Sequence, residues 1–232
     1  MSTEDREELL ADDRAALLAD DRAELRAVDG RVPGRRGLAT RRRLLDTTLA
    51  LLNTSTYRDL KVVDITRTAG TSPATFYQYF PDVEAAVLVL AAELTEHGSG
   101  ELRSLIVAQN WDDDPMAVAR RVADGYLDFW QAHWSLIRVI DLAALEGDER
   151  FRDLRTGLLH GANQAMDALV DTHVAEGRLP ETARPAAVAG VLTSMLAHVA
   201  AHRQGFENWG VPREQLRDTM AAIVAWSLSA AG

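Results

Sequence analysis

Residues 61–84, KVVDITRTAGTSPATFYQYFPDVE, have the pattern of two short helices joined by a tight turn. Val62, Ile65 and Ala69 are spaced i, i+3 and i+7, so they share one face of the first helix. Gly70 follows them, and glycine readily takes the left-handed conformation that ends a helix. This part of the stretch therefore predicts a first helix and the turn after it.

The second helix has recognisable boundary residues. Ser72 stands where an N-cap side chain is needed, and Pro73 occupies the first helical position. Phe76 and Phe80 are four residues apart and are predicted to point inward, and Pro81 stops the helix. The remaining polar side chains face outward or flank the apolar face: Ser72, Thr75, Tyr77, Gln78 and Tyr79. Two helices, a glycine turn and a surface of hydroxyl, amide and phenol groups are typical of a DNA-reading helix-turn-helix.

The charge of the chain is unevenly distributed. The 232 residues carry a net charge of −10, which taken alone argues against a general nucleic-acid binder. Residues 1–30 carry ten acids and four arginines, whereas residues 31–43 carry six arginines and no acid. Positive charge is therefore concentrated just before the two predicted helices, as binding to a phosphate backbone requires.

The N-terminal part predicts three segments. Residues 3–26 repeat an eight-residue unit and predict an acidic extension over 1–30, helical or disordered. This extension is either a solvated, frayed helix or a segment that contacts the arginines and competes with DNA. Residues 31–39 predict a flexible basic arm. A helix from Thr40 would place Arg41–Arg43 in its first turn, where cations oppose the helix dipole. Those arginines either bind phosphate or are solvated at a frayed helix end.

The rest of the chain has helical periodicity and no alternating strand pattern. A long helix is predicted from near Asp82, and Asp114 with Pro115 forms a strong helix start. Further helices are expected over 136–145, 151–175 and 185–202, followed by a loop over 205–212 and a last helix. The predicted fold class is all-α, with a three-helix head over 40–81 and a helical domain over 82–232.

With the helices placed, the chain resembles the TetR family of dimeric bacterial transcriptional regulators. The motif residues lie at that family's spacings: Ile65, Ala69, Gly70, Ser72, Thr75, Phe76, Tyr77, Tyr79, Phe80, Pro81 and Glu84. The aromatic run resembles the ethionamide-type regulators within the family, and the detailed match covers about 40–90. The resemblance implies a homodimer that binds double-stranded DNA and responds to a small-molecule effector.

The resemblance implies a recognition helix over 73–79. Within it Gln78 is the best candidate for a base edge, because its amide can pair with adenine. Tyr77 and Tyr79 are expected to donate to phosphates, which position the protein without specifying sequence. The full set of DNA-binding candidates is Arg35, Arg36, Thr40, Arg41, Arg42, Arg43, Lys61, Ser72, Thr75, Tyr77, Gln78 and Tyr79.

Three positions depart from the family pattern. Val83 occupies the position of a common phosphate-anchoring lysine, and the acidic Asp82 precedes it. Thr66 replaces a small alanine, and Lys61 stands where a Ser or Thr cap is common. Either the arginines upstream substitute for the missing lysine, or DNA affinity is weak, or the reading helices are used differently.

The resemblance also implies a C-terminal ligand-binding domain. The candidates are an aromatic group and a polar group on an apolar helix face: Tyr126, Phe129, Trp130, His133, Trp134, Asn163 and Met166. A buried amide such as that of Asn163 must be paired by the protein or by a ligand. The alternative is an ordinary core with a satisfied amide. Asp141 is similarly placed and would suit a cationic ligand if it were buried, whereas an exposed carboxylate carries no such implication.

The family forms its dimer as a four-helix bundle from the last two helices of each chain. This implies an interface containing Val191, Leu192, Met195, Val199, Met220, Ile223 and Trp226. A stripe of small residues on the first of these helices, which includes Gly190 and Ser194, would let another helix approach closely. Packing within one chain is the alternative for each residue.

Enzymatic function is not expected. His198 and His202 have the spacing of a helical zinc pair, but the sequence HVAAH lacks the glutamate of HExxH proteases and no third ligand is recognisable. A core or interface pair is the preferred interpretation, and no cofactor is expected. No apolar run approaches the ~20 residues that span a bilayer, and the chain has no cysteine and no secretory signal. We therefore expect a cytoplasmic regulator, a repressor released from a palindromic operator by a small, largely apolar molecule. The alternative is a binding or interaction module with a weakened DNA head.

Overall fold

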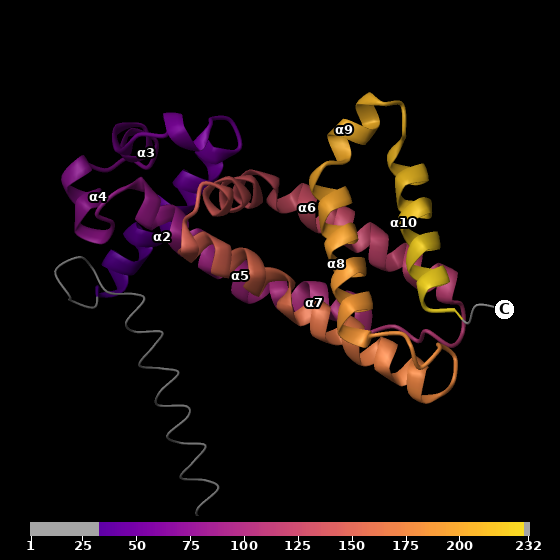
Figure 1. Cartoon of the computed structure of the whole chain (residues 1–232). Coiled ribbons are helices and arrows are strands. Elements are labelled where there is room, and N and C mark those ends of the chain that lie inside the picture. The colour runs from indigo at the N-terminus through magenta and orange to yellow at the C-terminus, as the bar shows by residue number, and fades with distance from the viewer. Residues whose placement is uncertain (1–32, 230–232) are drawn as a thin grey trace, which may run out of the picture. The chain divides into compact units, whose positions relative to one another are not determined.

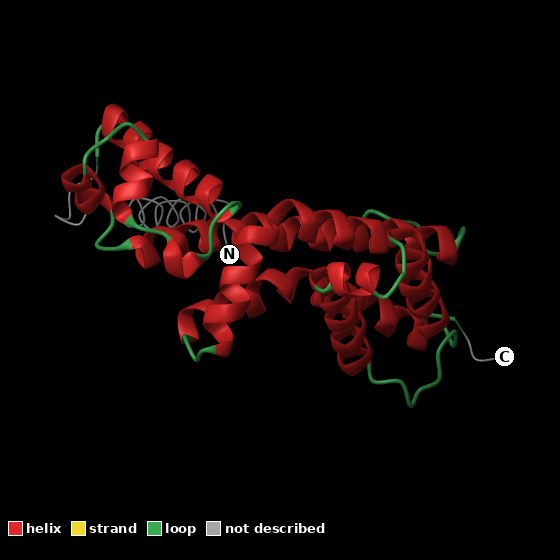
Figure 2. Ribbon diagram, turned by 90° about the horizontal axis from the view of Figure 1, so that it is seen from above, coloured by secondary structure: helices red, strands yellow, loops and turns green. Residues whose placement is uncertain are grey.

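The computed structural model describes residues 33–229, and the predicted acidic extension over 1–30 lies outside them. Within the described part, every regular element is a helix (Figures 1 and 2). The elements are α2 (Arg35–Leu52), η1 (Tyr57–Asp59), α3 (Val62–Thr68), α4 (Pro73–Tyr79), α5 (Val83–Val107), α6 (Pro115–Leu145), α7 (Glu149–Ala175), α8 (Pro185–Ala201), α9 (Arg203–Asn208) and α10 (Arg213–Ser227). The predicted all-α class is confirmed. None of the described helices is long and apolar enough to cross a membrane.

Residue contacts divide the chain into two compact units, one that ends at Leu90 and one that begins at Ala91. In the first unit, the head, α2 packs against α3 and α4, and α3 packs against α4. Its core is a continuous set of buried side chains from these helices: Leu44, Leu45, Leu52, Ile65, Phe76 and Phe80. The predicted turn is present, and Gly70 has a φ of 65° there, which a residue with a side chain adopts only with strain.

The first helix of the head begins earlier than its charge pattern predicted. Helix α2 starts at Arg35, so the predicted flexible arm over 31–39 is wrong from that residue on. Pro33 and Gly34 supply the break instead: Gly34 is extended, and its carbonyl accepts from the Leu38 amide at 3.0 Å to close the first turn. Arg35 and Arg36 therefore occupy the first turn, and Arg41 lies further inside the helix.

In the second unit, the C-terminal domain, α6 packs against α7, α8 and α10, and α7 packs against α8. Asp114 caps α6 as predicted, since its carboxylate accepts from the Ala117 amide at 2.9 Å. The separate helix expected over 136–145 is instead the last third of α6, because no helix-breaking residue precedes the buried Ser135 and Leu136. The loop expected over 205–212 contains most of α9, which ends at Asn208 and is followed by Trp209 and by Gly210, where φ is 83°.

A close approach between α5 and α7 depends on Gly161. The Gly161 amide donates to the Ser99 hydroxyl at 3.1 Å. A Cβ added at Gly161 would lie 2.8 Å from the Ser99 carbonyl oxygen, which belongs to the backbone and cannot rotate away. Glycine at this position therefore sets the distance between the two helices.

We expect Gly161→Ala to lower the free energy of unfolding by about 1–3 kcal/mol, because the added methyl group forces α5 and α7 apart. Gly100→Ala is the matched control, since Gly100 is an exposed helical glycine of α5 with open space around its Cβ position. That control should raise stability by about 0.5–1 kcal/mol through helix propensity. Urea unfolding followed by circular dichroism measures both. Equal effects of the two substitutions would contradict the close approach.

Candidate functional site

Helix α4 is oriented by its cap and by two buried rings. The Ser72 hydroxyl accepts from the Thr75 amide at 3.2 Å and lies 2.9 Å from the Thr75 hydroxyl. Phe76 and Phe80 are buried, with ring centroids 5.5 Å apart. Because this side of α4 is fixed inward, the opposite side faces solvent, and Tyr77 is 52% exposed there. Gln78, the predicted base-reading residue, is exposed next to it.

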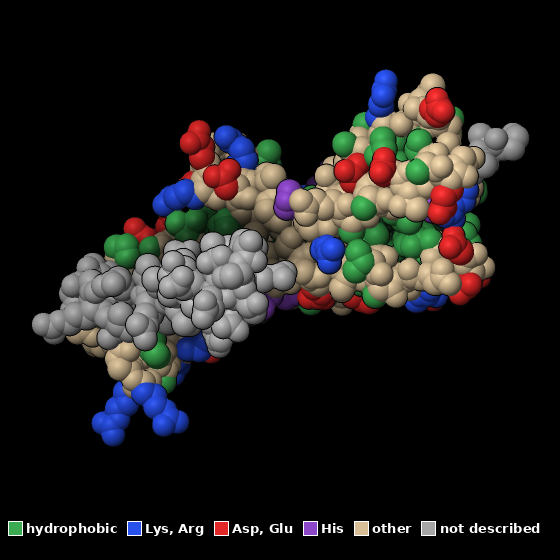
Figure 3. Space-filling model, turned by 90° about the horizontal axis from the view of Figure 1, so that it is seen from below, with side chains coloured by type: hydrophobic (Ala, Val, Ile, Leu, Met, Phe, Trp, Pro, Cys, Tyr) green, Lys and Arg blue, Asp and Glu red, His purple; other side chains and the backbone are tan. Residues whose placement is uncertain are grey.

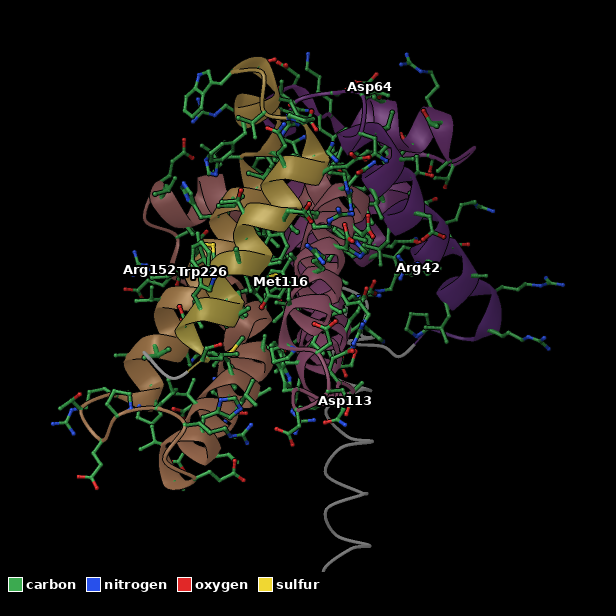
Figure 4. All side chains as sticks on the ribbon, turned by 90° about the vertical axis from the view of Figure 1, so that its right-hand side faces the viewer. Arg42, Asp64, Asp113, Met116, Arg152 and Trp226 are labelled. Carbon is green, nitrogen blue, oxygen red and sulfur yellow. The ribbon has the colours of Figure 1, made fainter. Side chains whose placement is uncertain are left out.

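Most of the predicted phosphate-binding side chains reach solvent. Arg35, Arg36, Arg43 and Lys61 are exposed, and basic side chains project from the head in Figure 3. Arg42 (labelled in Figure 4) forms a 2.7 Å ion pair with Asp46 one turn further along α2. An exposed pair of this kind is weak, so the guanidinium can exchange its carboxylate for a phosphate at small cost.

Arg41 is the buried member of the predicted phosphate-binding residues. Its side chain is only 6% exposed, and its guanidinium carbon lies 5.3 Å from the centroid of the Phe80 ring. This is the geometry of a cation–π contact, in which a planar guanidinium stacks over an aromatic face. This burial does not favour the predicted contact of Arg41 with phosphate. Arg41 packs against the same ring that anchors α4.

Two further predicted DNA-binding residues, Thr40 and Tyr79, make contacts within the head itself. The Thr40 hydroxyl donates to the Arg36 carbonyl at 3.1 Å. Tyr79 is half-buried, and a Cβ added at Gly37 would lie 3.2 Å from its hydroxyl. Tyr79 therefore lies against the start of α2, whereas Tyr77 extends into solvent.

Asp82, which the sequence marked as an unfavourable charge near DNA, has a structural function. Its carboxylate accepts from the Ala85 amide at 2.7 Å and so caps the start of α5. A carboxylate at a helix N-terminus is stabilised by the partial positive charge of the unpaired amides. Val83 is the first residue of α5 and is half-buried.

In the C-terminal domain, the predicted aromatic residues of α6 form a contiguous cluster. The Tyr126 and Trp130 rings are stacked, with centroids 5.6 Å apart and an interplanar angle of 6°. Phe129 lies edge-on to Trp130 at 5.4 Å, and its centroid is 4.7 Å from that of His133. Burial lowers the pKa of His133, and the nearby Glu101 carboxylate opposes part of that shift. The imidazole is therefore neutral at neutral pH.

Two polar atoms of this cluster are buried without a partner among the described residues. They are the Tyr126 hydroxyl and the Trp130 indole nitrogen. Burial raises the pKa of Tyr126 well above its ordinary value, so the hydroxyl keeps its proton and remains a donor. Buried donors without an acceptor each cost about 1–3 kcal/mol.

A pocket of about 120 Å³ lies where α6 meets the end of α8 and α9. It is lined by Leu127, Trp130, Gln131, Trp134, Ala200, Ala201, Arg203 and Gln204. Trp130 and Trp134 are the two predicted ligand residues that the structure brings together there. The sequence interpretation missed Leu127 and Gln131, although their i, i+3, i+4 and i+7 spacing with the two tryptophans marks one helix face. Arg203 and Gln204 had no such signal.

Asn163 and Met166 are not part of this pocket. The Asn163 amide oxygen lies 3.2 Å from the Thr193 hydroxyl of α8, which also lies 2.7 Å from the Ala189 carbonyl. One hydroxyl proton cannot fully satisfy both acceptors. Asp141 forms a 2.5 Å ion pair with Arg155 of α7, so the protein itself supplies the cation proposed for that carboxylate.

Helices α8 and α10 carry an exposed apolar surface. Val191 is 68% exposed and Trp226 (Figure 4) is 71% exposed, and Ile223 is also exposed. Met195 and Val199 are half-buried on α8, which contains no Asp, Glu, Lys or Arg. Leu192 and Met220 were predicted for the same surface, but both are buried in the core of the C-terminal domain itself. His198 and His202 are exposed on α8 and its C-cap, with ring centroids 4.1 Å apart.

Comparison with known families agrees with this division of the chain. Residues 44–88 match the bacterial regulatory proteins of the tetR family, and residues 102–231 match the tetracyclin repressor-like C-terminal domain. The chain belongs to the TetR family. It is a ligand-responsive DNA-binding transcriptional regulator, as the members of this family are.

Individual TetR-family proteins are related to it at low sequence identity. The chain is 26% identical over 180 residues to the HTH-type transcriptional regulator EthR of Mycolicibacterium smegmatis, covering 78% of this chain and 82% of that protein. The fatty acid degradation regulator FadR from Bacillus halodurans has the same fold, with a TM-score of 0.62 at 15% identity over 84% of this chain and 97% of that chain. FadR from Bacillus subtilis in complex with stearoyl-CoA has a TM-score of 0.61 at 14% identity, covering 79% of this chain and 97% of that chain.

We expect Tyr126→Phe to leave the free energy of unfolding of the ligand-free protein unchanged or to raise it by about 1 kcal/mol. The substitution removes a buried hydroxyl that has no partner. Tyr77→Phe removes the same atom from an exposed ring and should have no effect. Urea denaturation of both variants and the parent protein gives the comparison. A loss of more than 1 kcal/mol for Tyr126→Phe would show that the hydroxyl is hydrogen-bonded.

Proposed function

We propose that this regulator binds a palindromic operator as a homodimer in the cytoplasm and is released by a small, largely apolar molecule. The observation that carries the proposal is the α4 surface, on which Tyr77 and Gln78 extend into solvent while Phe76 and Phe80 are buried behind them. A short helix whose apolar face is packed in the core and whose polar face is exposed meets the geometric requirement for reading the major groove.

The roles within the head follow from chemistry and exposure. Gln78 presents an amide that can pair bidentately with adenine, so it is the proposed base-reading residue. Arg35, Arg36 and Lys61 are exposed cations, and Tyr77 has an exposed hydroxyl, so these side chains are proposed to contact phosphates. Binding should weaken as salt rises, because each neutralised phosphate releases counterions.

The exposed apolar surface of α8 and α10 supports the homodimer. Val191 and Met195 follow one line along α8, and Ile223 and Trp226 lie on the solvent side of α10. Helix α8 contains no Asp, Glu, Lys or Arg, and together with Ile223 and Trp226 it exposes an apolar area that monomeric proteins usually cover. A second copy of the chain supplies an identical apolar surface, as isologous dimers require.

The alternative function, a ligand-binding module with a weakened DNA head, rests on Val83 and Asp82. Asp82 is already engaged as the cap of α5, so its charge is partly offset by the helix terminus. The exposed cations of α2 outnumber the one lysine that Val83 replaces. DNA binding is therefore the better-supported function.

Selection of genomic DNA fragments by the purified protein at low salt tests the proposal. We expect enrichment of a palindromic sequence, with affinity that falls steeply as the salt concentration is raised. Recovery of fragments without any sequence preference would exclude the operator-binding function and favour the alternative module.

Gln78→Ala should lower the affinity for the selected operator about 10- to 100-fold, since a bidentate base contact contributes about 1–3 kcal/mol of discrimination. Affinity for unrelated DNA should stay within about twofold, because phosphate contacts are retained. Gln164→Ala, at an exposed glutamine of α7, is the matched control and should change neither value. Fluorescence anisotropy with labelled operator and with labelled unrelated DNA measures the two affinities. Equal weakening on the operator and on unrelated DNA would assign Gln78 to the backbone instead.

Val191→Arg should convert the dimer to a monomer, because it places a charge in the apolar surface of α8. Leu145→Arg is the control, since Leu145 is an apolar residue that is 85% exposed at the end of α6, outside this surface. We expect that variant to remain dimeric. Sedimentation equilibrium measures both masses, and a dimeric Val191→Arg protein would place the interface elsewhere.

A further inference from the structure

The pocket formed by α6, α8 and α9 is lined by hydrogen-bond donors and by no carboxylate. Its polar side chains are the indoles of Trp130 and Trp134, the amides of Gln131 and Gln204, and the guanidinium of Arg203. An indole and a guanidinium can only donate. The Trp130 nitrogen has no exposed surface, so the donors that can reach the pocket belong to the other polar side chains of the lining. The lining therefore favours a ligand that supplies acceptor atoms.

Arg203 has unused donor capacity beside this pocket. One terminal nitrogen donates to the Gln131 amide oxygen at 2.6 Å, and Nε lies 3.3 Å from the Glu207 carboxylate. The second terminal nitrogen has no partner within the described chain, and the side chain is only 21% exposed. Partial burial strengthens the attraction of a guanidinium for an anion relative to a fully solvated one.

Gln131 is oriented by the same network. Its amide oxygen accepts from Arg203 and also lies 3.4 Å from a terminal nitrogen of Arg213. Because the oxygen faces two cations, the amide NH₂ group is the part of Gln131 left to donate. Two donors of different elements, the Gln131 amide on α6 and the Arg203 guanidinium on α9, thus line one pocket.

The rest of the pocket is apolar and narrow. Leu127 and the two indole rings come from one face of α6, and the alanines at the end of α8 complete it. The volume of about 120 Å³ is close to the ~150 Å³ of a cavity that holds one benzene molecule. Trp134, Gln131 and Gln204 are exposed, so the pocket is open to solvent on one side.

We infer that this pocket binds a small organic carboxylate, with its apolar body against the indole rings and its carboxylate on Arg203. The inference rests on the proposed effector-binding function of the C-terminal domain and names the chemical class of the molecule bound. Glu207 contacts Nε of Arg203 and leaves the second terminal nitrogen for the ligand, but its carboxylate repels a ligand carboxylate bound there. A neutral or cationic analogue of the same shape lacks the group that Arg203 recognises.

The test is a titration of the full-length protein with benzoate and its neutral analogue benzamide, followed by the indole N–H signals in ¹H–¹⁵N NMR spectra. Trp130→Phe and Trp134→Phe spectra assign the two relevant signals. We expect benzoate to shift these signals and to bind at least ten times more tightly than benzamide, since a charge-assisted hydrogen bond is about twice as strong as a neutral one.

Two variants of the ion pair should act in opposite directions. Arg203→Gln should weaken benzoate binding at least tenfold and leave benzamide unchanged, whereas Glu207→Gln should tighten benzoate binding a few-fold. Arg178→Gln is the matched control, because Arg178 pairs with Asp112 and Glu176 and is not part of the pocket lining. Thermal unfolding of each variant verifies that it is folded.

Equal affinity for benzoate and benzamide, or unchanged benzoate binding by a folded Arg203→Gln protein, would overturn the carboxylate assignment. Either result leaves operator selection untouched, so it does not bear on the proposed regulator function. The opposite combination of results is also distinguishable. If the protein selects no operator but binds benzoate through Arg203, the carboxylate pocket is supported and the DNA-binding proposal is rejected.

Discussion

The exposed surface of α4, which is the proposed DNA-reading surface, depends on the burial of Phe76 and Phe80. Helix α4 has only seven residues, far fewer than the ~12–15 that an isolated helix needs to be even marginally stable in water. Its conformation is therefore imposed by tertiary contacts: the two rings enter the head core, and Ser72 satisfies an amide at the start. Once these three groups are fixed, the helical period alone determines that Tyr77 and Gln78 face solvent. The exposed polar face of α4 is therefore a geometric consequence of the burial of its apolar face.

The same rings explain why the arginines of α2 are not equivalent. Arg41 is buried, and its guanidinium lies over the Phe80 ring. Its charge therefore stabilises the ring that anchors α4 in the head core. Arg43 and the two arginines of the first turn are exposed and keep their charge at the surface. Helix periodicity separates them, because residues 41 and 43 lie about 200° apart around the axis. A run of three arginines thus combines one side chain that packs in the core with others that are proposed to bind phosphate.

The sequence predicted the class of the fold, the two reading helices and the caps at Ser72 and Asp114, since each depends on local residue chemistry. It placed the start of α2 too late, because the arginine pattern suggested an arm, whereas Pro33 and Gly34 set the boundary. It also treated Leu192 and Met220 as surface residues, since periodicity marks an apolar face without showing which other helix covers it. Only part of the pocket could be predicted. The α6 residues of the lining share one helix face that the sequence reveals. Arg203 is the first residue of α9, and most of that helix was expected to be a loop.

The C-terminal domain carries donors that the folded chain does not satisfy. The Tyr126 hydroxyl and the Trp130 indole belong to one stacked pair, and neither has an acceptor among the described residues. In an ordinary core such atoms are removed or paired, because each unsatisfied group costs about 1–3 kcal/mol. Both atoms have no exposed surface, so a bound molecule recovers this cost only where its binding displaces the surrounding side chains. A molecule that occupies the pocket without such a displacement leaves the cost in place, so its recognition depends on the side chains that line the pocket.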